Sequence, residues 1–324
     1  MSCIAVWFSL RSPEDKSALS TMEVHFNFWR PRNRKFRQIK QCMDIGLMVE
    51  ETINIASIYV YLPFVVTEKI EDLGAKLEST SSLQAVFNEP WRSLADPGIT
   101  TIDVVDFEKA KLFQIYRISE EDIKIQTAYD GSMLQLVLPD GIHNKTYFRF
   151  RIYANTLSPI IKEDKPSNSW LESAFFVTET VDFHLNEKRN LPEDLLRTLH
   201  TAGEVVFTKT HLFLMRPDNF DHTFSYPSPV DSRTLEPKIW IDYLGPQYSS
   251  ERIIAYHWKQ KINDTAVFDK NIDHMGFKSF NVFTKFRYQS ASITTIIIFI
   301  SILLAISFAG SLVAAWLFKL ISPS

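Results

Sequence analysis

Glycine and cysteine are both scarce in this chain of 324 residues, which contains nine glycines and two cysteines. Loops that cradle nucleotide phosphates need clustered glycines, and average glycine usage is about 7%. The glycine content therefore argues against a Rossmann or P-loop enzyme. The two cysteines, Cys3 and Cys42, imply no disulfide framework, which fits a reducing compartment.

Strong catalytic motifs are also missing. The sequence contains no His-Glu-x-x-His, Cys-x-x-Cys or Gly-x-Ser-x-Gly pattern, each of which would indicate a metal site or a nucleophile. Its formal net charge of −3 is close to neutral, so charge gives no general case for a nucleic-acid-binding protein. We predict no catalytic residue, no cofactor and no metal site, and the sequence favours a non-enzyme without excluding an enzyme.

One long stretch lacks charge altogether. The 27 residues from Ser292 to Phe318 contain no charged side chain, and as a helix they would reach about 40 Å. The hydrocarbon core of a bilayer is about 30 Å thick, and each crossing needs about 17 or more residues. The sequence therefore predicts one transmembrane helix over 292–318 and a short tail over 319–324.

The charges beside this helix predict its orientation. Lys278, Lys285 and Arg287 precede the span, whereas only Lys319 follows it. Basic residues collect on the cytoplasmic side of membrane helices, so we expect the N-terminal region to be cytoplasmic. The early run "CIAVWFSL" has no basic residue before it, unlike a signal peptide.

The region before the helix is rich in β-branched and aromatic runs, which favour strands. We predict a mainly β fold with sandwich-like antiparallel sheets and two or three short helices. The plainest strand-like runs are "INIASIYVYLPFVV", "GITTIDVVDF", "AKLFQIYRI", "IKIQTAY", "MLQLVLP", "KTYFRFRIYA", "SAFFVTETVDFHL", "EVVFTKTHLFLM", "PKIWIDYL" and "ERIIAYHWKQKI". In "TYFRFRIYA", alternation predicts a half-buried strand with Tyr147, Arg149 and Arg151 on one face and Phe148, Phe150 and Ile152 on the other.

Turns and helices complete the predicted organisation. Asp-Gly pairs in Tyr129–Ser132 and Pro139–Ile142 indicate turns beside strands. Apolar spacing predicts a helix over Thr67–Thr80, and a cap-like Asn190 with Pro192 and Gly203 predicts another over Asn190–Gly203. We expect residues 1–21 to form a loose extension and 22–291 to form one domain, with a possible subdomain break in the proline-rich stretch 216–237.

A basic and aromatic segment follows the first part of this domain. It contains Trp29, Arg30, Arg32, Arg34, Lys35, Arg37 and Lys40. Such residues can line a charged turn after a strand, lie on an anionic lipid surface or a protein partner, or grip phosphate and stack on bases. The sequence leaves these three interpretations open, with the charged turn preferred.

Two weaker groups contain histidine. Asp218, Asp221 and His222 could ligate a divalent metal with help from distant residues, although polar loop residues explain them better. Asp182 and His184 alternate onto one face of a predicted strand, where they could serve as a general acid or base. A solvent-facing pair is the simpler interpretation of that alternation.

Small residues recur four apart inside the predicted membrane helix. Ser301, Ala305 and Ala309 form one row, and Gly310 with Ala314 forms another. Small residues at this spacing let membrane helices approach closely, so we predict self-association through the tail. Their frequency in ordinary membrane helices is the competing explanation.

A cytoplasmic β-rich module followed by the membrane segment Ser292 to Phe318 resembles the transmembrane effectors of bacterial anti-phage defence systems, including the retron-associated ones. The resemblance implies a toxin that perturbs the inner membrane and causes growth arrest or cell death in abortive infection. It also implies an inhibiting partner, such as a reverse transcriptase with its RNA–DNA product, for which Trp29 to Lys40 is one contact. The alternative is a tail-anchored adaptor or enzyme whose helix only localises it.

Overall fold

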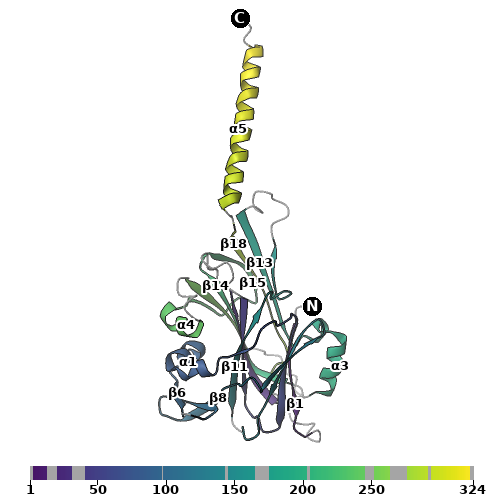
Figure 1. Ribbon diagram of the computed structural model, residues 1–324, viewed down its shortest axis with the longest axis vertical. Helices are drawn as coiled ribbons and strands as arrows, with labels where there is room; N and C mark the ends of the chain where they lie inside the picture. The colour runs from purple at the N-terminus through teal and green to yellow at the C-terminus, as the bar shows by residue number, and fades with distance from the viewer. Residues whose placement is uncertain are drawn as a thin grey trace.

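The computed structural model shows two stacked β-sheets with one helix projecting from them (Figure 1). It describes residues 3–12, 20–30, 41–96, 98–142, 145–164, 175–202, 205–244, 252–262, 276–290 and 293–321. Strands dominate these residues, which confirms the predicted mainly β fold with a C-terminal apolar helix.

The first sheet has eight strands. In spatial order they are β15 (Phe220–Tyr226), β18 (Phe280–Gln289), β13 (Phe176–Leu185), β1 (Cys3–Leu10), β4 (Ile55–Leu62), β10 (Gly131–Val137) and β9 (Ile123–Ala128), with β12 (Ile161–Asp164) also paired to β13. All but one of its pairings are antiparallel, the exception being β1 with β13.

The second sheet has ten strands. In spatial order they are β16 (Asp231–Thr234), β17 (Ile253–Lys261), β14 (Val205–Pro217), β2 (Ser20–Trp29), β3 (Gln41–Val49), β11 (Thr146–Ala154), β8 (Lys111–Tyr116), β7 (Thr101–Val105) and β6 (Arg92–Ala95), with β5 (Glu71–Asp72) also paired to β11. Two of its pairings, β2 with β14 and β8 with β11, are parallel. The sheets are therefore mixed rather than purely antiparallel.

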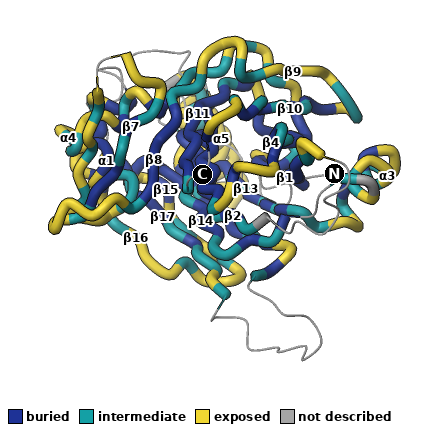
Figure 2. The backbone as a smooth tube through the Cα atoms, turned by 90° about the horizontal axis from the view of Figure 1, so that it is seen from below, coloured by how far each residue is buried: buried dark blue, intermediate teal, exposed yellow. Residues whose placement is uncertain are grey.

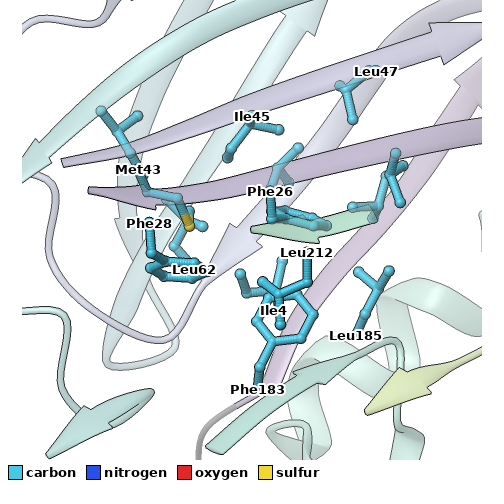
Figure 3. Close-up of a cluster of buried hydrophobic side chains, with 14 of the residues drawn as sticks. Ile4, Phe26, Phe28, Met43, Ile45, Leu47, Leu62, Phe183, Leu185 and Leu212 are labelled. Carbon is cyan, nitrogen blue, oxygen red and sulfur yellow. The ribbon is translucent and has the colours of Figure 1, made fainter. Parts of the chain in front are cut away.

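The main core fills the space between the two sheets. Phe26 and Phe28 of β2 project toward Phe183 of β13, with ring centroids 5.2 and 5.9 Å apart (Figure 3). Ile4 and Leu62 contribute from the first sheet, and all five side chains are nearly or fully buried. Burial of such apolar area is the dominant stabilising contribution to a fold of this kind.

Short helices cover the outer faces of the sandwich. α1 (Thr80–Phe87) and α4 (Pro237–Leu244) lie on one side, and α3 (Glu193–Thr201) lies on the opposite side (Figure 2). α1 and α4 enclose a second apolar cluster against the second sheet, while α3 encloses a third against the first sheet. Two 3-10 turns, Ala75–Glu78 and Lys188–Asn190, precede α1 and α3. Both faces of each sheet are thus partly covered.

The strands also divide into two halves along the chain. β1 to β11 occupy one side of both sheets, and β12 to β18 occupy the other. Parallel pairing of β1 with β13 and of β2 with β14 joins the halves, and we call this junction the seam. The main core includes residues from both halves, so they fold around one interior.

Several local expectations are corrected by the structure. Residues 1–21 are not simply a loose extension, because apolar Cys3–Leu10 forms a buried strand between β13 and β4. The stretch 216–237 is not one long loop, since it contains β15 and β16 in different sheets, and the halves change before β12 instead. The run "PKIWIDYL" is helix α4, because its apolar side chains meet the outer face of a sheet at helical spacing.

The helix predictions had mixed outcomes. α3 lies within the predicted range Asn190–Gly203. The range Thr67–Thr80 instead contains β5 and a 3-10 turn separated by irregular residues, and α1 begins only at Thr80. Pairing of β5 with β11 supplies backbone partners that outweigh the weak helical pattern.

The predicted turn at Tyr129–Ser132 joins β9 to β10. Tyr129 and Asp130 have positive φ angles of 54° and 61°, as a type I′ hairpin turn requires. Gly131 serves a different need, because a Cβ atom there would lie 2.1 Å from the carbonyl oxygen of Leu62. The glycine is therefore required by close approach of the neighbouring strand.

Strand β11 is buried on both faces, so the predicted half-buried strand is wrong. Arg149 and Arg151 are fully or almost fully buried on its outer face. Asp44 Oδ1 accepts a 2.6 Å hydrogen bond from Arg151 Nε, and Asp44 Oδ2 accepts from Trp29 Nε1 at 2.7 Å and from Tyr243 Oη at 2.9 Å. α4 brings Tyr243 over these charges and thereby closes the cluster.

Removing Asp44 should expose the energetic importance of this buried cluster. We expect Asp44→Ala to lower the free energy of unfolding by about 3–5 kcal/mol, because Arg149 and Arg151 would lose their buried counter-charge. Denaturant unfolding of the detergent-solubilised chain measures this change. Glu193→Ala breaks the exposed pair with Arg197 and should cost less than about 1 kcal/mol. Equal effects of the two substitutions would contradict the assignment.

Candidate functional site

The basic and aromatic segment of the sequence is divided by the structure. Trp29 is fully buried and packs near Trp240, with ring centroids 5.4 Å apart. Arg30 pairs with Glu163 and Glu179. Arg32, Arg34, Lys35, Arg37 and Lys40 lie outside the described residues. Trp29 is thus a core residue and is not exposed for lipid or partner contact in this conformation.

The two histidine groups named from the sequence are each satisfied locally. His222 Nε2 lies 2.9 Å from Thr284 Oγ1 on the neighbouring strand β18. Among the described residues, Asp218, Asp221 and His222 do not bring their ligand atoms together as a metal site would require. Asp182 and His184 do share a face, with Oδ1 and Nε2 2.9 Å apart, but His184 is only 15% exposed and also contacts Glu187. Neither group opens into a described cavity.

A different group comes together at the seam. Glu23 and His25 of β2 and His211 of β14 place their ligand atoms within 4.8 Å of one another, and no other such group of three occurs in the described part of the chain. Glu23 and His25 are two residues apart on one strand, so they share its outer face. Parallel register places His211 directly beside His25.

A β-bulge in β14 puts His211 on this face. Phe207 pairs with Met22, but Lys209 pairs with Glu23, so Thr208 is an extra residue. Phe207 before the bulge and Leu212 after it both point into the main core, although strict alternation would separate them. The extra residue reverses the facing of all that follows. Lys209 and His211 consequently face outward with Glu23 and His25.

Glu23 is the centre of the polar contacts. Its Oε1 lies 2.8 Å from His25 Nε2, 3.0 Å from Lys209 Nζ and 3.4 Å from His211 Nε2. A carboxylate only accepts hydrogen bonds, so Nε2 of His25 carries the hydrogen. The Nδ1 of His25 then accepts from the Tyr147 hydroxyl at 3.1 Å.

Neighbouring side chains orient both imidazoles. Tyr147 Oη also accepts a 2.7 Å hydrogen bond from Arg149 Nη1, which links the site to the buried charge cluster. His211 Nδ1 lies 2.8 Å from His257 Nε2, and their rings are stacked. Gly46 leaves space for this arrangement, since a Cβ atom there would lie 2.1 Å from Tyr147 Oη.

These residues line a cavity of about 380 Å³ between the second sheet and helices α1 and α4. Phe87, Trp91 and Trp240 contribute apolar walls, while Lys209 and Lys259 contribute positive charge. The cavity is partly enclosed and combines apolar walls with several charged and polar groups, and convergent polar groups in an enclosed space are typical of a small-ligand site. The sequence offered one usable signal, the alternating pairs Glu23 with His25 and Lys209 with His211.

Burial controls protonation in this site. It lowers the pKa of His25, lowers that of His211 well below its ordinary value, and lowers that of His257 to about 4, with nearby Lys259 and His25 adding to the last shift. Burial alone would raise the pKa of Glu23, but the adjacent His211 and His25 side chains and Lys209 hold it well below its usual range. Neutral imidazoles therefore surround an ionised carboxylate.

The depressed histidine pKa values predict acid sensitivity. Between the ordinary pKa of 6.5 and the value of about 4 for His257, the unfolded chain binds more protons than the folded chain. The stability that the neutral histidines contribute is therefore fully present above the unfolded pKa, and it is lost as the pH drops toward the folded pKa. The free energy of unfolding falls by up to about 1.4 kcal/mol per pH unit for each histidine. Glu23 contributes in the same direction only at lower pH.

Denaturant unfolding at a series of pH values measures this loss. His257→Gln should reduce the slope between about pH 6 and pH 5. His200→Gln, at an exposed position of α3 outside the site, is the matched control. An unchanged slope in His257→Gln, or no loss of stability on acidification, would contradict the expected linkage.

Comparison with known proteins provides no family for this chain. No protein-family model matches the sequence, and no curated protein matches it with significant similarity. The resemblance to anti-phage effectors therefore stays a prediction based on architecture. Functional interpretation depends on the seam site, the cavity and the apolar helix themselves.

Proposed function

We propose that this protein is a membrane-anchored effector of anti-phage defence. Its cytoplasmic β domain recognises a signal or partner, and its C-terminal helix produces the output by perturbing the bacterial inner membrane, with growth arrest or cell death as the result. The observation that carries this proposal is the isolated apolar helix α5 (Ile293–Ile321), which extends away from the sandwich (Figure 1).

The exposure of α5 supports a place in the bilayer. The segment Thr294–Ile321 spans 28 residues, and none of its most apolar window is buried against the domain. A core helix of a soluble protein would bury such side chains, but Leu304 and Phe308 are 66% and 68% exposed. A helix of 28 residues is about 42 Å long, enough to cross a hydrocarbon core of about 30 Å with tilt.

The connection to the domain is short. β18 ends at Gln289 and α5 begins at Ile293, so three residues separate strand from helix. The backbone N–H of Ser290 donates to the carbonyl oxygen of Phe175 at 2.8 Å, and the rings of Phe175 and Phe299 meet edge to face at 5.2 Å. This base favours a domain held close to the membrane, on the side where Lys285 and Arg287 lie.

A membrane output requires several copies. Ser301 and Ser311 donate their hydroxyl hydrogens to carbonyl oxygens of their own helix, those of Ile297 and Ser307, each at 2.9 Å. A single helix then offers no continuous polar wall for water or ions. Association through the rows of Ser301, Ala305 and Ala309 and of Gly310 and Ala314 is the proposed route to an assembly.

The inhibiting partner belongs to the same proposal. By resemblance, a reverse transcriptase with its RNA–DNA product keeps the toxin inactive until infection. The basic residues between Arg32 and Lys40 remain its proposed contact, whereas Trp29 is withdrawn because it is buried. Arg30 contributes only if it exchanges Glu163 and Glu179 for the partner.

A tail-anchored enzyme or adaptor is the second candidate function. The cavity beside Glu23, His25 and His211 favours it, because an enclosed space with convergent polar groups is typical of small-ligand sites and needs no membrane to bind. In that case α5 serves only to localise the domain.

Stopping the chain before Ser292 distinguishes the two functions. We expect the full-length protein, expressed in bacteria and released from inhibition, to sediment with membranes, depolarise them and reduce survival, because the apolar helix is the active element. The shortened chain should be soluble and harmless. Toxicity of equal strength without the helix would contradict the effector proposal and support activity in the β domain.

Bulky substitutions in the small-residue rows of α5 test self-association through this helix. Gly310→Leu with Ala314→Leu should preserve insertion but weaken self-association at least several-fold, because close helix approach becomes impossible. Crosslinking in membranes, followed by sizing, measures the change. Ile306→Leu with Val313→Leu is the matched control outside the small-residue rows. Identical oligomer sizes in both double variants would argue against this interface.

A further inference from the structure

We propose that Glu23, His25 and His211 form a binding site for a divalent first-row transition-metal ion such as Zn²⁺. The ligand atoms are Oε1 of Glu23, Nε2 of His25 and Nε2 of His211, which converge at the edge of the cavity. This inference goes beyond the proposed membrane function and does not depend on it.

The spacing of the ligand atoms suits such an ion. Zinc binds histidine nitrogen and carboxylate oxygen at about 2.0–2.2 Å, so two ligands of a tetrahedral site are separated by about 3.4 Å. Oε1 of Glu23 lies 3.4 Å from His211 Nε2 and 2.8 Å from His25 Nε2. The third pair, Nε2 of His25 and Nε2 of His211, lies within 4.8 Å.

His211 provides an independent sign of a missing ligand. Its Nε2 is buried and has no well-oriented hydrogen-bond partner among the described residues. The distance of 3.4 Å to Glu23 is also long for a hydrogen bond. A metal ion between these two atoms would satisfy the nitrogen lone pair and the carboxylate together.

The chemistry of the surrounding groups is favourable as well. Zinc is bound by imidazole nitrogen and carboxylate oxygen, which are the atoms that these three residues bring together. When Nε2 of each imidazole binds the ion, Nδ1 carries the hydrogen. That hydrogen can be donated to Tyr147 Oη from His25 and to His257 Nε2 from His211, across the existing contacts of 3.1 and 2.8 Å.

Two histidines and one carboxylate leave coordination positions open. The three ligands come from the sheet, while the cavity of about 380 Å³ lies on their other side. Structural zinc sites are usually closed by four protein ligands, whereas three ligands and an open position are typical of sites that bind water or substrate. The arrangement therefore assigns a small anionic or carbonyl ligand to the cavity, beside Lys259.

Lys209 opposes the ion and acts as its competitor. Its Nζ lies 3.0 Å from Glu23 Oε1, and the side chain is 31% exposed, so it can turn outward when a cation enters. Lys259 adds positive charge to the same cavity and Asp231 adds negative charge. Replacing Lys209 with methionine should consequently raise metal affinity.

The ion would also connect the two halves of the fold. Glu23 and His25 belong to β2 and His211 belongs to β14, so the ion would bind one ligand set on each side of the seam. Because the ion binds the folded chain in preference to the unfolded chain, its addition should raise the unfolding temperature.

Calorimetric titration of Zn²⁺ into the metal-stripped, untagged full-length protein in detergent tests the proposal. We expect one ion per chain and a higher unfolding temperature, with no comparable response to Mg²⁺ or Ca²⁺, which prefer oxygen ligands. Co²⁺ should produce the visible absorption of a low-coordinate nitrogen and oxygen site.

Matched variants identify the ligands. Glu23→Gln should weaken Zn²⁺ binding about 10–100-fold and His211→Ala by at least about 100-fold, whereas Lys209→Met should strengthen it. His222→Ala, outside the cavity, is the control. Circular dichroism checks that each variant is folded. If His211→Ala does not fold, Glu23→Gln and Lys209→Met still test the site, because both preserve the shape of the side chain. Absence of stoichiometric binding, or equal affinity in Glu23→Gln and wild type, would overturn the proposal.

Discussion

Parallel pairing of β2 with β14 is the constraint on which the rest of the structure depends. It joins the two halves within the second sheet, while β1 and β13 join them within the first. Backbone hydrogen bonds must be satisfied across this seam because both strands are buried. The pairing also determines which outward side chains meet, and the bulge at Thr208 decides that His211 is among them. Without this one extra residue, Lys209 and His211 would face the other side of the sheet and the polar site would not form.

The outer face of the second sheet carries an unusual amount of buried polarity. Asp44, Arg149 and Tyr243 form one hydrogen-bonded cluster, and Tyr147 connects it to His25. Buried charges are costly unless every member is paired, so such a layer restricts the positions its members can occupy. α4 completes the cluster through Tyr243 and also lines the cavity through Trp240. Fold stability and site geometry consequently share the same helix.

The apolar helix α5 and the cavity belong to different parts of the molecule. α5 follows β18 at one end of the sandwich (Figure 1). The cavity is lined by residues of β2, β14 and β17 and of helices α1 and α4. β18 pairs with β13, which pairs with β1 across the seam. The base of α5 therefore belongs to the first sheet, whereas Glu23, His25 and His211 belong to the second.

Local signals in the sequence were sufficient for the apolar helix α5, about half of the strands and α3. Charge-free length predicts α5 because lipid demands apolar side chains along the whole span, and β-branched runs predict strands such as β13 and β17. The same signals failed for "PKIWIDYL", where packing against the second sheet overrides the strand preference. They also left Cys3–Leu10 unassigned, although this apolar run pairs with strands that are distant in the sequence. Pairing across the seam and the bulge were decided only in the tertiary structure, since they bring together Lys209 and Glu23 from positions 186 residues apart. The sequence by itself therefore determined the β-rich composition and the apolar helix, whereas the site of Glu23, His25 and His211 exists only because the tertiary structure sets strand register and burial.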